Sequence, residues 1–254
     1  GWPGITFSSS DTNIATVDAN GLLTAWQSGT ATITASYGGL SNSQPVTVSG
    51  SALPRTHVAV ATSGQLQDYI VVGSVWISNR VIRASGYSGL VYNSNSLYVA
   101  SGGSVGRIDP ADGTYTNIVT RGVNTPGWTD GNVEAMVTGP DGRLYLSPNV
   151  STSSRGVFAF NPDGTDFTSW IPTNGSGWTL QMTRGLSWAG DDLYVASRQN
   201  NNVYKFHASG DPLAATFEAT VNSASMASPQ GLLVLGETNL YSFGSSGAIY
   251  KIDL

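Results

Sequence analysis

Residues 185–197 read GLSWAGDDLYVAS: an apolar strand, a short polar turn, and a Leu-Tyr pair that opens a second strand. The same phrase recurs at residues 89–101, 135–147 and 231–243. Its leucines are Leu97, Leu144, Leu193 and Leu240, so the unit repeats every 47 to 49 residues. A period of this length, built from short strands, is typical of a β-propeller in which each repeat forms one blade.

A polar turn and a third strand follow each phrase, and three of the four repeats continue into a fourth strand. Ahead of the first phrase, two-residue alternation predicts four compressed strands, at residues 57–61, 69–72, 75–78 and 81–84. We therefore expect a β-propeller of about five short blades, four of them clear repeats, over residues 51–254. A ring of four blades is the alternative. The last repeat ends on its third strand, so either the segment near residues 57–61 or another subunit would complete that blade.

Residues 1–50 carry a different pattern, which predicts a small β-sandwich. Short alternating strands are expected at residues 5–8, 14–17, 22–26, 31–35 and 45–49, with Asp18-Ala19-Asn20-Gly21 as a turn. The run SSSDTNIATVDANGLLTA at residues 8–25, followed by GTATITA, resembles the bacterial Ig-like domain of group 2 over residues 5–49. That resemblance implies a spacer or host-binding module of surface and phage proteins, without catalytic residues.

Such Ig-like domains begin with an additional strand, whereas only four residues precede Ile5 here. We therefore expect a sandwich that lacks its first strand. Truncation explains this most simply, and a strand donated by a neighbouring subunit would also cover the open sheet edge.

The segments TDGNVEAMVTGPDGRLYLS at residues 129–147 and LYVASRQNNNVYKFHASGDPLAATF at residues 193–217 resemble NHL and gluconolactonase-like propellers. Members of these families include lactonases, lyases, and rings that bind only protein or RNA. The resemblance thus implies the fold and leaves the chemistry open.

The amino-acid composition disfavours some classes of binding partner and indicates where the protein is located. Charged residues make up 11% of the chain, against roughly 25% in an average domain, and the net charge is −5. With two lysines and no basic stripe, a nucleic-acid partner is not expected. Cysteine is absent, and no apolar run approaches the roughly 18 residues of a membrane span. The Ser/Thr/Asn/Gly-rich composition favours a secreted, extracellular or cell-surface protein.

The residue just before each phrase is expected to line the mouth of the propeller channel. These residues are Ser88, Glu134, Arg184 and Gln230. They predict either a polar site for a small ligand or a solvated channel in which Glu134 and Arg184 pair. Gluconolactonase-like enzymes hold a divalent cation here, but Arg184 would repel one. We therefore predict no metal, no cofactor and no catalytic residue.

Two loop tryptophans, Trp128 in PGWTDG and Trp178 in GSGWTLQ, are candidate contacts for a glycan or a protein; the alternative is a hydrophobic plug between blades. His57 and His207 are badly placed for a general base, and no Ser–His–Asp set, phosphate loop or HExxH motif occurs.

The sequence favours a non-catalytic surface protein: an Ig-like spacer and a propeller working as an adhesion or structural-assembly subunit of a filament, sheath or virion. Its partner would be a second copy or a neighbouring surface subunit. A lactonase-type enzyme using Glu134 and Arg184, and a lectin using the loop tryptophans, are the alternatives.

Overall fold

The computed structural model of the chain describes residues 4–49, 55–61, 65–72, 75–83, 88–93, 96–109, 114–149, 156–210, 213–222, 226–236 and 238–254. These residues form strands and loops and no helix, which confirms the all-β fold class. The chain divides into two compact units, Gly1–Ala59 with Asp68–Arg80 and Val60–Gln67 with Val81–Leu254. The linker predicted at residues 51–54 lies outside the described residues.

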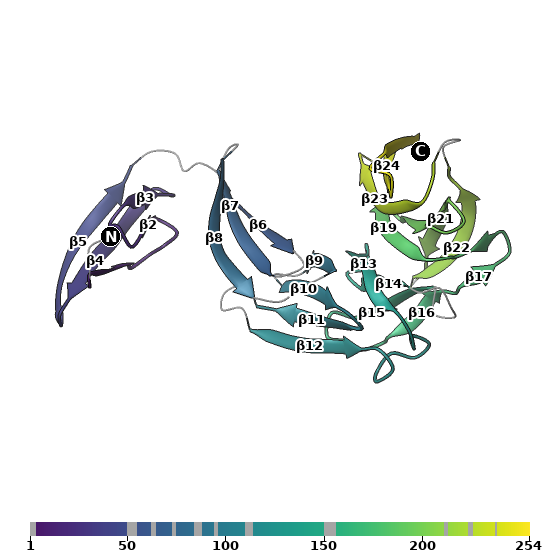
Figure 1. The fold of residues 1–254 in the computed structure, drawn as a ribbon, viewed down its shortest axis with the longest axis horizontal. Helices are drawn as coiled ribbons and strands as arrows, with labels where there is room; N and C mark the ends of the chain where they lie inside the picture. The colour runs from purple at the N-terminus through teal and green to yellow at the C-terminus, as the bar shows by residue number, and fades with distance from the viewer. Residues whose placement is uncertain are drawn as a thin grey trace. The chain divides into compact units, whose positions relative to one another are not determined.

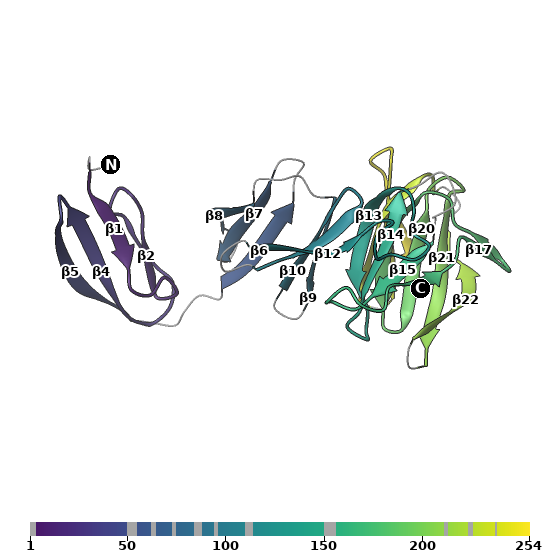
Figure 2. The ribbon, with the colours of Figure 1, turned by 90° about the horizontal axis from the view of Figure 1, so that it is seen from below.

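The N-terminal strands form two small antiparallel sheets, one ordered β1-β4-β5 and the other pairing β2 with β3 (Figure 2). Asp18 fixes the turn between β2 and β3, because its Oδ1 accepts hydrogen bonds from the backbone N–H of Asn20 and of Leu22, each at 2.8 Å. Gly21 completes this turn at a φ of 82°, where glycine is favoured. The strands are β1 (Thr6–Ser9), β2 (Ala15–Val17), β3 (Leu23–Ala25), β4 (Gly29–Tyr37) and β5 (Leu40–Val48).

Each of three phrases opens a four-stranded antiparallel sheet whose strands follow one another in chain order (Figure 1). The strands β17 (Asn174–Gly175) and β18 (Trp178–Thr179) form a separate small hairpin. The strands of the three sheets are β9 (Gly89–Asn93), β10 (Ser96–Ser101), β11 (Ser104–Ile108), β12 (Tyr115–Thr120), β13 (Asn132–Thr138), β14 (Leu144–Asn149), β15 (Val157–Phe160), β16 (Thr168–Ile171), β19 (Thr183–Ala189), β20 (Asp192–Ser197), β21 (Asn202–Ser209) and β22 (Ala214–Thr220).

The fourth phrase opens a three-stranded sheet of β23 (Pro229–Leu235), β24 (Asn239–Gly244) and β25 (Ile249–Asp253). The first strands of these four sheets, β9, β13, β19 and β23, contact one another in that order. The first strand of each repeat thus contacts that of the next repeat, as expected for the inner strands of propeller blades.

The Leu-Tyr pair accounts for the stacking of the sheets. Neighbouring residues of a strand point to opposite faces, so the leucine packs against one adjacent sheet and the tyrosine against the other. Tyr98 and Leu144 accordingly share one buried cluster, Tyr145 and Leu193 a second, and Tyr194 and Leu240 a third. The phrase therefore recurs because every interface between sheets needs both members.

The segment ahead of the first phrase forms three strands rather than the four that alternation predicted. They are β6 (Arg55–Ala61), β7 (Leu66–Val72) and β8 (Val75–Arg83), in a sheet of that order. The two strands expected at residues 75–78 and 81–84 are one strand. No glycine or proline stands between them to turn the chain, so the extended backbone continues through Asn79 and Arg80.

Candidate functional site

The predicted channel residues coincide with irregularities in the first strands. The register of β13 on β14 shifts between Val133 and Ala135, so Glu134 is an extra residue without a partner opposite it. A register shift at the same place in β19 and in β23 likewise leaves Arg184 and Gln230 without a partner opposite them. A bulge of this kind bends the strand and redirects the side chain of the extra residue, and bulges are enriched beside functional sites. Three repeats thus present one redirected polar residue at the same point.

The backbone just before each of these strands is left-handed. Gly131 has a φ of 80°, Met182 of 53° and Ser228 of 48°. This conformation costs a non-glycine residue roughly 1–2 kcal/mol, so Met182 and Ser228 hold it because the neighbouring strands fix the chain. The strain is repeated at two equivalent positions, which marks the start of the first strand as a constrained feature of the fold.

Glu134 and Arg184 form an ion pair that joins β13 to β19. The side chains are 26% and 16% exposed, so water screens the pair only in part. Arg184 Nε is buried and has no hydrogen-bond partner among the described residues. The ion pair neutralises the two charges of the ring with each other.

The remaining two ring residues lie against neighbouring strands. Ser88 Oγ donates a 2.7 Å hydrogen bond to the carbonyl oxygen of Val133, which links the first repeat to β13. Gln230 is half-buried, and within the described part of the chain its side chain makes no hydrogen bond to the other three. The structure therefore brings Glu134 and Arg184 together and places Ser88 and Gln230 on either side of them.

Removing the negative charge of the pair by Glu134→Gln is expected to lower the free energy of unfolding by about 1–3 kcal/mol, because Arg184 then keeps a largely buried charge without a counter-ion. Urea denaturation of Glu134→Gln, Arg184→Gln and the double variant gives the coupling energy. Asp253→Asn is the matched control, since the Lys251–Asp253 pair is exposed and should contribute less than about 1 kcal/mol. Additive losses in the double variant would contradict the pairing.

Trp128 is wholly buried, which corrects its interpretation as a glycan contact. Its ring stacks on Phe167 at a centroid distance of 6.1 Å, and its Nε1 donates to the carbonyl oxygen of Asp130 at 3.0 Å. A ring enclosed by the sheets of two repeats cannot reach a ligand, so Trp128 is the hydrophobic plug that was the alternative.

Trp178, by contrast, is half-buried in the loop that carries β17 and β18. Its ring packs against Phe206 and Phe217, both with centroids 5.4 Å away. The remainder is accessible, so Trp178 stays a candidate contact for a glycan or a protein.

A cluster that sequence patterns did not single out lies on β20, β21 and β22. The ligand atoms of Asp192, His207 and Glu218 fall within 4.8 Å of one another, as in a metal site. Lys205 Nζ, however, lies 2.8 Å from a carboxylate oxygen of Asp192 and 2.8 Å from one of Glu218. The ammonium group therefore already occupies the place of a cation between these two carboxylates.

Hydrogen bonds within this cluster shift the pKa of Asp192 and that of His207. Burial works to raise the pKa of Asp192, but the bonds from Lys205 and His207 hold it below its ordinary value. The bond from His207 Nδ1 to Asp192 raises the pKa of the imidazole. His207 is thus tied to a carboxylate on the neighbouring strand, and the side chain of His57, in β6, lies outside the described residues.

These features define an Ig-like domain followed by a β-propeller fold, and comparisons with known proteins agree. Residues 4–52 match the family model of the bacterial Ig-like domain (group 2). No curated protein matches the sequence. Within the described residues, no helix could cross a membrane.

Solved structures similar to this chain include propeller enzymes. A luciferin-regenerating enzyme aligns with a TM-score of 0.56 at 12% identity, over 79% of this chain and 74% of its own. An aldose sugar dehydrogenase from Streptomyces coelicolor, in its PQQ-bound form, aligns with a TM-score of 0.53 at 14% identity, over 99% and 98%. The extracellular domain of a protein assigned as a hybrid two-component system from Bacteroides thetaiotaomicron aligns at 0.55 and 12%, over 100% and 32%. Identities this low establish a shared fold alone.

Proposed function

We propose that this chain is a non-catalytic extracellular protein, in which an Ig-like domain (residues 1–50) carries a propeller (residues 51–254) that serves adhesion or structural assembly. The observation that carries the proposal is the Glu134–Arg184 ion pair. It occupies the ring where lactonase-type propellers hold a cation. A guanidinium at this point repels a metal ion, and it already pairs with the carboxylate that would bind one.

The Ig-like domain offers a surface for assembly. β5 is an edge strand of the sheet β1-β4-β5, nine residues long and without a charged side chain. Beside it is a shallow groove of about 230 Å³, lined in part by Ile5, Tyr37 and Leu40, and Leu40 is 79% exposed. Long, uncharged and exposed edges readily pair with a strand of another chain, and here only Pro45 interrupts the row of donors. These features support contact with a second copy or a neighbouring surface subunit.

Sedimentation velocity over a range of concentrations tests the assembly role. We expect the full chain to self-associate, and Leu40→Lys to weaken this association at least tenfold, because a charge on the edge opposes pairing. Leu22→Lys is the matched control, as Leu22 is also exposed, at 67%, in the same domain but ahead of β3. A monomer at all concentrations would contradict self-assembly.

A separate assay tests the absence of catalysis. The chain is incubated with glucono-δ-lactone and γ-butyrolactone in the presence of Ca²⁺, Mn²⁺ or Zn²⁺, and no turnover above the buffer rate is expected. Hydrolysis that disappears in Glu134→Gln would favour the lactonase-type alternative instead.

A further inference from the structure

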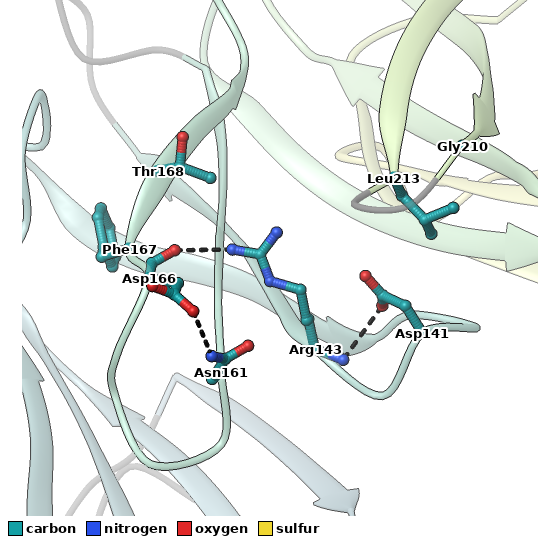
Figure 3. A pocket seen from close by; sticks show the side chains of 8 residues that line it. All are labelled: Asp141, Arg143, Asn161, Asp166, Phe167, Thr168, Gly210 and Leu213. Atoms are coloured by element: carbon teal, nitrogen blue, oxygen red, sulfur yellow. Dashed lines mark hydrogen bonds between the residues drawn. The ribbon is translucent and has the colours of Figure 1, made fainter.

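A groove of about 800 Å³ lies between the hairpin turns of two neighbouring repeats (Figure 3). It is bounded by the turn between β13 and β14, by the turn between β15 and β16, and by Gly210 and Leu213 beside β22. The turn between β13 and β14 follows the last residue of β13, whereas Glu134 stands near its first, so the groove lies at the opposite end of the strand from the ring. Its volume is in the range of small-molecule sites, roughly 300–1,000 Å³.

Arg143 stands in the middle of this groove. Its backbone N–H donates to Asp141 Oδ1 at 3.1 Å, and its Nη2 donates to the carbonyl oxygen of Asp166 at 2.7 Å. Figure 3 shows the guanidinium between the hairpin of Asn161 and Asp166 on one side and Asp141 and Leu213 on the other. Among the residues that the structure describes, nothing accepts a hydrogen bond from Nη1. Arg143 is therefore held in place with donors still available.

Acceptors surround this donor. Asp166 Oδ2 accepts a 2.7 Å bond from Asn161 Nδ2, which leaves Oδ1 for a ligand and turns the amide oxygen of Asn161 toward Arg143. Asp141 Oδ2 accepts from the hydroxyl of Tyr145 at 2.9 Å. Thr168 adds a hydroxyl, and Leu213 an apolar side chain. The groove thus holds both donors and acceptors, with an apolar side chain beside them.

The charges of the groove select among ligand classes. An inorganic anion would face the carboxylates of Asp141 and Asp166, and a cation would face the guanidinium of Arg143. A neutral polyol avoids both penalties, because each of its hydroxyl groups donates to a carboxylate while accepting from an N–H. We propose that this groove binds a neutral sugar residue through Arg143, Asp141, Asn161 and Asp166. The site is separate from the ring and from the loop of Trp178, and it does not depend on the proposed assembly role.

Asp166→Asn is the informative variant. Asp166 has a φ of 53°, which asparagine adopts readily, so the hairpin keeps its shape while the charged acceptor is lost. Asp163→Asn is the matched control: Asp163 lies in the same hairpin, outside the groove, and accepts bonds from the N–H and the hydroxyl of Thr165 at 3.0 and 2.7 Å. Thr168→Val is a second groove variant of almost unchanged shape.

The test is saturation-transfer NMR and chemical-shift titration of the full chain with glucose, galactose, mannose and N-acetylglucosamine at millimolar concentration. At least one sugar is expected to bind, about tenfold more weakly to Asp166→Asn, more weakly to Thr168→Val, and unchanged to Asp163→Asn, with melting temperatures equal throughout. Absence of binding by all four sugars would overturn the proposal, as would binding that both groove variants leave intact. Tighter binding of inorganic phosphate or Ca²⁺ than of any sugar would overturn the ligand class.

Discussion

Replacing Trp128 by alanine is expected to lower the free energy of unfolding by about 3–5 kcal/mol, the usual cost of removing a buried aromatic side chain. The indole is fully buried between two sheets, stacks on Phe167 and lies 6.5 Å from Phe158 between ring centroids. Its removal leaves a cavity and also removes the hydrogen bond from the indole Nε1 to the carbonyl oxygen of Asp130. Urea denaturation followed by fluorescence of the remaining tryptophans measures the loss.

Trp178→Ala is the control for this experiment, because Trp178 is only half-buried and its removal should cost markedly less. If the two variants lost the same free energy, or if Trp128→Ala were as stable as the parent, Trp128 would not be the core residue described above.

Replacing Gly185 by alanine is the second large effect we expect. A Cβ at this position would stand 2.9 Å from the carbonyl oxygen of Gln230 and 2.9 Å from the backbone nitrogen of Leu232. Both are backbone atoms of β23, so β19 and β23 must move apart, and crowding of this kind costs about 1–3 kcal/mol or more. Thermal unfolding of the variant should show a lower melting temperature.

The matched control is Gly103→Ala. The three atoms nearest to a Cβ there belong to the Arg121 side chain, at 3.1–3.3 Å, so the crowding is milder than against the backbone atoms that face Gly185. Hydrogen exchange adds a local measurement, since faster exchange in Gly185→Ala should concentrate in β19 and β23. Equal stability of the two variants would contradict the close approach of these strands.

Much of the fold could be predicted from the sequence because each repeat contains the pair of residues that packs it against both neighbouring sheets. Leu144 and Tyr145 are neighbours in a strand, so a Leu-Tyr pair in every unit already implies a sheet with two buried faces. The strand β8 was harder to predict, because the polar residues Ser78 and Asn79 resemble a turn in composition although nothing there forces the backbone to bend.

The positions of the candidate ring residues could be predicted from the sequence, whereas the contacts between them could not. The position of Glu134 and Arg184 follows from counting back from each phrase, but their ion pair depends on bulges that only the register of neighbouring strands shows. Trp128 was misplaced for a related reason. Its neighbours Gly127 and Asp130 are typical of an exposed turn, and the aromatic rings that cover it come from residues 30 or more positions later.

The groove around Arg143 could not be predicted from the sequence, because its residues are of the types that tight turns ordinarily contain. Asp and Gly at residues 139–142 and 161–164 are what tight turns select, so their residue types alone suggested nothing further. The concave surface forms only because these two turns of one sheet lie together beside Gly210 and Leu213 of the next repeat. The sequence pattern of a single repeat does not predict a site that residues of two repeats form together.

The Leu-Tyr interface also has a consequence for how such a chain can change in length. Because the tyrosine of one unit meets the leucine of the next, each unit presents the same two faces whatever its neighbours are. A duplicated repeat inserted between two others would find a leucine partner on one side and a tyrosine partner on the other. Gene duplication can therefore enlarge this architecture one blade at a time, and loops are free to diverge, since the coupling between units resides in two adjacent residues of a single strand.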